Sequence, residues 1–166
     1  MVVSRAANSD TFQVSTPSDR EVCMTRLFNA PRQLVFEAMT KPEHIRRWWG
    51  ILDERYSVSS CEVDLRPGGA WRFVGNGPRG EVVFYGVYRE INAPERVVFT
   101  EIFAPFPQEE SLVTSLMSEE NGKTRLTVTA RYSSLEVRDM VLGTGMARGA
   151  AISYDRLEEV AAELQA

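Results

Sequence analysis

The sequence has few of the residues on which metal sites, disulfide frameworks and nucleophilic triads depend. It contains one histidine, His44, and two cysteines, Cys23 and Cys61, without Cys-x-x-Cys spacing. One histidine cannot supply a His-rich metal cluster or a Ser-His-Asp site with a spare base, so we expect neither a metal nor a cofactor. We interpret His44 as a partly exposed helix residue and the cysteines as buried free thiols. A disulfide would need adjacent strands and an oxidising compartment.

Long apolar runs and an excess of positive charge are also missing. No stretch approaches the ~20 apolar residues that a membrane span needs, and the first residues lack the apolar core of a secretion signal. The 19 basic and 23 acidic residues give a net charge of −4, which provides no general attraction to phosphate backbones. Arg46-Arg47 beside Trp48-Trp49 are too few for a nucleic-acid stacking platform. We therefore expect a cytoplasmic protein without a membrane span or a nucleic-acid partner.

What is present is typical of one globular domain. The 166 residues are 43% hydrophobic and 25% charged, close to globular averages. Residues 1–18 are rich in Ser, Thr, Asn and Asp without an apolar period, so we expect a flexible tail there and a single domain over residues 19–166.

Apolar periodicity and turn residues predict an α+β protein. Period-two patterns predict seven mostly antiparallel strands, at 20–28, 56–65, 70–74, 81–91, 96–103, 111–117 and 123–132. Helical spacing predicts helices at 31–39, 42–49 and 134–164, the last capped by Ser134 and broken around Gly143-Thr144-Gly145. One long helix is left to cover one face of the sheet, so the sheet must curl around it in a helix-grip fold.

One segment formally matches a dinucleotide fingerprint. Gly75-Asn76-Gly77-Pro78-Arg79-Gly80 has the G-x-G-x-x-G spacing, but a strand and not a helix follows it. Without a helix N-terminus to face a pyrophosphate, the segment is better interpreted as a hairpin loop.

The last helix carries an uneven apolar face. Its C-terminal half offers Leu157, Val160 and Leu164, whereas its N-terminal half offers mainly Gly149, Ala150 and Ser153. Aromatic residues on the strands could line an apolar hollow at the end that lacks bulk, or could collapse into a closed core. The predicted ligand-binding residues are Trp48, Trp49, Trp71, Phe73, Tyr85, Phe99, Glu101, Met146, Ala150 and Tyr154.

Four ordered motifs resemble a known family. They are Phe28-Asn29-Ala30-Pro31, Pro42-Glu43-His44 with Trp48-Trp49-Gly50, the segment 65–73 and the segment 94–101. Together they resemble the activator-of-heat-shock-protein-ATPase-like family of the START-like, birch-pollen-allergen-like superfamily. The resemblance implies a seven-stranded antiparallel sheet that grips a C-terminal helix around a hydrophobic cavity. In one departure, Gly149-Ala150 stands where relatives commonly have Gly-Trp, and Ser153-Tyr154 where they have Ser-Leu.

Three functions follow as hypotheses. The leading one is binding of a hydrophobic or aromatic small molecule without chemistry, entering between the long helix and the Trp48-Trp49 segment. A second is a cyclase-like or hydrolase-like enzyme in which Glu101 or a tyrosine moves a proton, although no catalytic residue is assigned. A third is a co-chaperone-type interaction module that uses the outer face of the sheet. A homodimer is compatible with each.

Overall fold

The computed structural model describes residues 11–166, and its elements follow the expected order with one addition. The strands are β1 (Phe12–Ser15), β2 (Glu21–Phe28), β3 (Ser57–Val63), β4 (Ala70–Gly77), β5 (Gly80–Asn92), β6 (Arg96–Phe103), β7 (Glu110–Glu120) and β8 (Lys123–Arg131). The helices are α1 (Arg32–Thr40), α2 (Pro42–Trp48), α3 (Leu135–Gly143) and α4 (Met146–Gln165).

All eight strands form one antiparallel sheet in the order β1-β2-β8-β7-β6-β5-β4-β3. The expected count of seven strands was therefore too low. The additional strand, β1, lies inside the segment expected to be a tail, and it pairs with β2 because Phe12 and Val14 alternate into the core. Residues 1–10 of that expected tail lie outside the described residues.

Two hairpins form where turn residues predicted them. Asn121 and Gly122 both have positive φ, 53° and 80°, which is the conformation of a two-residue turn that follows strand twist. Gly77 pairs with Gly80 across the β4–β5 hairpin. The predicted hairpin is therefore present, but its loop is shorter than expected, because β4 continues to Gly77 and only Pro78 and Arg79 lie between the strands.

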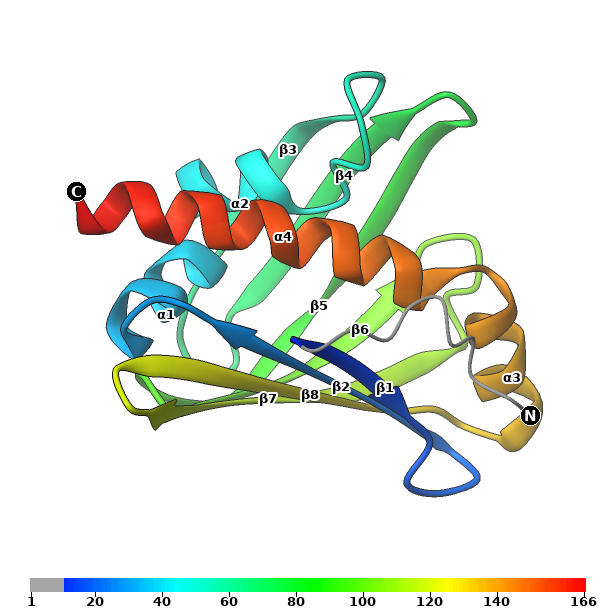
Figure 1. Cartoon of the computed structure of the whole chain (residues 1–166). Helices are drawn as coiled ribbons and strands as arrows, with labels where there is room; N and C mark the ends of the chain where they lie inside the picture. Colours follow the sequence, from blue (N-terminus) through cyan, green and yellow to red (C-terminus); the bar gives the residue numbers. More distant parts are fainter. Residues whose placement is uncertain (1–10) are drawn as a thin grey trace.

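The C-terminal helical segment consists of two helices. The Ser134 hydroxyl accepts a hydrogen bond from the Val137 N–H and caps α3, and Gly145, at φ 82°, separates α3 from α4. Figure 1 shows α4 lying across the concave side of the curled sheet, with α1 and α2 beside it. The helix-grip architecture is therefore confirmed, with the expected break at residues 143–145.

The core is tightest at the C-terminal half of α4. Leu157, Val160 and Ala161 are almost fully buried there. The Arg26 guanidinium, also buried, joins β2 to α4 through ion pairs with Asp155 and Glu158. This end of α4 is held by apolar packing and by charge.

Within residues 11–166, no helix combines the length and the apolar character needed to cross a membrane.

Candidate functional site

The interior next to the middle of α4 is filled by aromatic rings around Tyr154. Tyr154 is buried, and its ring lies 6.1–6.4 Å, centroid to centroid, from the rings of Phe12, Phe28 and Trp48. The Trp48 indole N–H donates to the Ala38 carbonyl at 2.8 Å. Trp48 and Tyr154 therefore belong to the closed part of the interior.

Beside this cluster, several residues around the start of α4 and on the concave face of the sheet are only partly buried, although Ala147 itself is buried. Several side chains that face α4 from the sheet, and the helix residues opposite them, keep partial solvent exposure. We call this set the inner site: Phe73, Phe84, Phe99, Glu101, Phe103, Met146 and Ala150. The small side chains of the helix leave these rings without a complete cover, which agrees with the uneven face seen in the sequence.

The rings of the inner site pack against one another along the sheet. Trp49 meets Phe73 and Phe84 edge-on, with centroids 5.3 and 5.7 Å away, and Phe84 stacks on Phe103 at 4.9 Å. Trp71 lies 4.9 Å from Phe73 and is itself buried. These contacts form a continuous apolar wall, the surface that suits a hydrophobic ligand.

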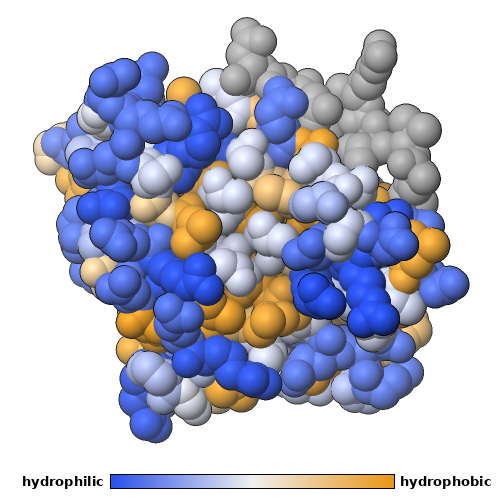
Figure 2. All heavy atoms as spheres, turned by 90° about the horizontal axis from the view of Figure 1, so that it is seen from below, coloured by the Kyte–Doolittle hydropathy of each residue, from blue (hydrophilic) through white to orange (hydrophobic). Residues whose placement is uncertain are grey.

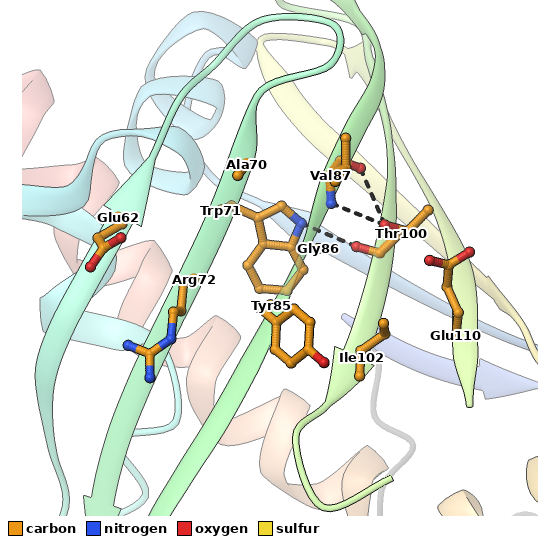
Figure 3. Close-up of a pocket in the computed structure, with 10 residues that line it drawn as sticks. All are labelled: Glu62, Ala70, Trp71, Arg72, Tyr85, Gly86, Val87, Thr100, Ile102 and Glu110. Carbon is orange, nitrogen blue, oxygen red and sulfur yellow. Dashed lines mark hydrogen bonds between the residues drawn. The ribbon is translucent and has the colours of Figure 1, made fainter. Parts of the chain in front are cut away.

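A gap in the β5–β6 pairing lies beside this wall. Tyr85 pairs with Ile102 and Tyr88 with Phe99, but between these pairs the Thr100 hydroxyl accepts the Val87 N–H at 2.9 Å. The Trp71 indole N–H crosses this gap and donates to the Thr100 carbonyl at 3.1 Å, as Figure 3 shows.

Gly86 permits this crossing. A methyl group on Gly86 would meet the Thr100 carbonyl oxygen at 1.8 Å and the Trp71 indole nitrogen at 2.8 Å. The absence of a side chain is therefore what lets the indole reach across the strand.

Glu101 is the one ionisable residue of the inner site. It lies on β6 between Phe99 and Phe103, which alternate onto the same face of the sheet. Desolvation by the surrounding apolar groups raises the pKa of Glu101 to about 7. Burial is the main cause that raises the pKa values of Tyr132 and Tyr154, and the charge of Glu101 raises both further. Near neutral pH the carboxyl group is therefore present both as acid and as carboxylate.

The loop at the mouth of the inner site is anchored to α4. The buried Ser153 hydroxyl accepts a hydrogen bond from the Gly50 N–H at 3.1 Å, and the Arg156 guanidinium donates to the Ile51 carbonyl at 2.5 Å. A methyl group on Gly149 would find only Leu52, at 3.9 Å. The loop is thus fixed at 50–51, and α4 has open space beside Gly149.

Two hollows indent the outer face and its edge. The first, of about 480 Å³, includes Arg72, Tyr85, Val87 and Ile102 in its lining (Figure 3), and the second, of about 300 Å³, lies near Leu112. Neither is lined by a residue of α4. They are therefore distinct from the cavity that the sequence predicts between sheet and helix, and the first follows from the gap in β5–β6 pairing.

The predicted site residues consequently divide into three groups. Phe73, Phe99, Glu101, Met146 and Ala150 meet in the inner site, with Trp49 and Trp71 packed against its rings. Trp48 and Tyr154 belong to the closed interior. Tyr85 does not join either group, because the Phe84 ring faces inward and Tyr85, next along the strand, lines the outer hollow.

Tyr132 is a residue of this region that the site prediction omitted. It follows β8 directly, and the inward series Leu126, Val128 and Ala130 continues to it with period two. That alternation was the signal that could have identified it.

Among residues 11–166, no group of three or more His, Cys, Asp or Glu side chains could hold a metal ion. Both cysteines are free, and Cys61 is buried as expected, but Cys23 is only partly buried because its side chain lies on the other face of β2 from Val22 and Met24.

Comparison with known proteins agrees with this architecture. The model of the family described as Activator of Hsp90 ATPase homolog 1-like protein matches residues 29–162. No curated protein matches the chain.

Several solved structures have a similar fold. A protein from Rhodobacter sphaeroides is 25% identical, with a TM-score of 0.83 over 92% of this chain and 99% of that one. Protein Ms6760 from Mycobacterium smegmatis is 24% identical, with a TM-score of 0.80 over 90% and 96%. Protein NE0264 from Nitrosomonas europaea is 22% identical, with a TM-score of 0.78 over 90% and 99%. At these identities the likeness concerns the fold.

Proposed function

The chain belongs to the Activator of Hsp90 ATPase homolog 1-like family, and we propose that it is a binding module for a hydrophobic or aromatic small molecule held at the inner site. The ligand enters between the first turns of α4 and the segment that follows α2, and burial against the aromatic wall supplies most of the affinity.

One observation carries the proposal: side chains that face the helix at the inner site are partly exposed, while those one or two turns further along α4 are closed. Phe99 and Phe103 are large apolar side chains that remain partly exposed. Each Å² of apolar surface left in contact with water lacks about 25 cal/mol of the stabilising free energy that its burial would give. A ligand that covers these rings regains that free energy. The proposal needs no chemical step.

Ligand-dependent thermal stability tests the proposal. Naphthalene-type and biphenyl-type compounds are titrated against the natural chain, Ala150→Trp and the control Ala162→Trp, which changes an exposed residue of the same helix. A compound at about 100 times its dissociation constant adds about 2.7 kcal/mol, which raises the melting midpoint by roughly 5–11 °C. We expect this rise in the natural chain and in Ala162→Trp, and its loss in Ala150→Trp.

The proposal is refuted if no compound raises the midpoint, or if Ala150→Trp retains the full rise. The second result would place binding away from α4, for example in the outer hollow of Figure 3.

A second function is favoured by the outer face of the sheet. Three apolar side chains there, Val87, Leu112 and Leu116, are each about 40% exposed. We call these three residues the outer patch. Figure 2 shows apolar side chains gathered in the middle of the face seen from below, within a border of hydrophilic ones. Because the family description names an activator of the Hsp90 ATPase, we propose an Hsp90-type chaperone as the partner of this patch.

Capture on an immobilised Hsp90-type chaperone, with its ATPase rate as a second readout, tests this function. Leu112→Glu and Leu116→Glu should abolish capture and any stimulation, whereas Ala150→Trp should leave both unchanged. Loss in Ala150→Trp but not in the outer-patch variants would contradict the assignment.

A further inference from the structure

Resting on the proposed ligand function, we infer that the inner site selects molecules with an apolar body and one hydrogen-bond-accepting carbonyl oxygen, and that the Glu101 carboxylic acid donates the hydrogen bond to that oxygen.

The geometry begins with the position of Glu101 on β6. Its backbone neighbour across the strand pair is Ser111, whose hydroxyl donates to the Glu101 carbonyl at 3.2 Å and not to its carboxyl group. Within residues 11–166, no hydrogen bond or ion pair reaches the Glu101 side chain, although rings flank it on both sides. The carboxyl group keeps some contact with solvent, and a ligand that covers it would have to supply a hydrogen-bond partner in place of water.

Two phenols lie close enough to Glu101 for its charge to affect their titration. Tyr132, from the segment after β8, and Tyr154, from α4, are the titratable side chains that sense the charge of Glu101. No Lys or Arg contributes to its titration, which burial alone governs. In the part of the chain that the structure describes, neither phenol hydroxyl has a protein hydrogen-bond partner. The inner site therefore offers the Glu101 carboxyl group as its polar group and otherwise apolar surface.

The absence of a cation decides between the two forms of Glu101. An ionised carboxylate in apolar surroundings without a counter-ion is disfavoured, so the neutral acid, which is a donor, is the form in which Glu101 meets a ligand below neutral pH. A carbonyl oxygen accepts that hydrogen bond, a hydrocarbon cannot, and an ammonium group would require the opposite protonation state.

Three probes with one skeleton test the inference: 2-acetylnaphthalene, 2-isopropylnaphthalene and 1-(2-naphthyl)ethylamine. Their dissociation constants are measured by calorimetry at about pH 6 and about pH 8.5. One hydrogen bond corresponds to roughly a 5- to 10-fold change in affinity. We expect the acetyl compound to bind tighter than the isopropyl compound by about that factor at the lower pH, and the advantage to disappear at the higher pH.

Substitutions test whether Glu101, and no other residue, causes the preference for the acetyl compound and its pH dependence. Glu101→Gln keeps a donor that does not titrate, so the preference for the acetyl compound should persist at both pH values. Glu101→Leu should lose the preference at both while it still binds the isopropyl compound. His44→Gln removes the only histidine and should leave the pH dependence of the natural chain unchanged. If Glu101→Leu does not fold, the Gln variant and the pH series decide the question.

Each outcome has a distinct meaning. Equal binding of the acetyl and isopropyl compounds at both pH values refutes the carbonyl selection and leaves the proposed binding function intact. Preference for the amine at the higher pH also refutes it, because Glu101 would then act as an anion. Failure of all three probes to bind refutes the binding function for this ligand class and the selection with it.

Discussion

Replacing Glu101 with glutamine should make the folded protein more stable at alkaline pH. Burial in apolar surroundings raises the pKa of Glu101 from its usual 4.5 to about 7, so the folded chain holds a proton that the unfolded chain releases. Because the folded chain binds this proton more tightly, protonation of Glu101 stabilises the folded state fully below about pH 4.5. This stabilisation is lost as the pH rises through 7. Glutamine has nearly the same shape, stays neutral at every pH and escapes this loss.

The magnitude follows from the width of that pH interval. The two pKa values lie roughly 2.5 pH units apart, and each unit corresponds to about 1.4 kcal/mol. Since the side chain retains some contact with solvent, we take about 3 kcal/mol as the upper bound and expect about 2. The difference in unfolding free energy between Glu101→Gln and the natural chain should therefore grow by about 2–3 kcal/mol between about pH 4.5 and pH 8, and then level off.

Urea unfolding followed by tryptophan fluorescence, at several pH values across that range, measures this difference. Glu119→Gln, which changes an exposed residue of β7, is the control and should show no such growth. A difference for Glu101→Gln that is constant within about 0.5 kcal/mol would refute the argument, because it would mean that the carboxyl group is as well solvated in the folded chain as in the unfolded one.

Three further predictions concern stability and reactivity, and urea titrations measure the first two. Gly86→Ala should destabilise the fold by about 3 kcal/mol or more, because the added methyl collides with a neighbouring backbone carbonyl, whereas Gly143→Ala, which meets open space, should change stability by less than about 1 kcal/mol. Arg26→Ala should cost about 3 kcal/mol, because it removes a buried cation from between β2 and α4 and leaves its space unfilled. Iodoacetamide, followed by mass spectrometry, should modify Cys23 well before Cys61 in the native protein, because burial raises the pKa of the Cys61 thiol to about 11; equal rates would contradict this.

Features set by neighbouring residues were predictable from the sequence. The Asn121-Gly122 turn and the break at Gly145 depend on backbone conformations that only a few residue types adopt readily. The uneven apolar face of α4 was also predictable, because helical spacing assigns Leu157 and Ala150 to one face of the helix without reference to the sheet.

Features set by distant partners were not predictable in the same way. The segment Val82-Val83-Phe84-Tyr85 is apolar throughout, so its alternation does not reveal which ring faces the helix. Pairing with β4 and β6 decides this and places Phe84 inside and Tyr85 outside. Strand β1 was missed because four residues with two buried side chains resemble a tail until β2 lies beside them.

The position of aromatic bulk along α4 decides where the interior is closed. Tyr154 lies one turn, about 5.4 Å, beyond Ala150 on the same helix, and its ring fills the space among Phe12, Phe28 and Trp48. Ala150 supplies no such bulk one turn earlier. Phe99, Glu101 and Ala150 are only partly buried, in contrast to Tyr154. Bulk at Tyr154 and its absence at Ala150 thus agree with a closed cluster around Tyr154 and with a partly exposed Glu101 carboxyl group that has no hydrogen-bond or ion-pair partner within residues 11–166, which is the arrangement that the proposed ligand selection requires.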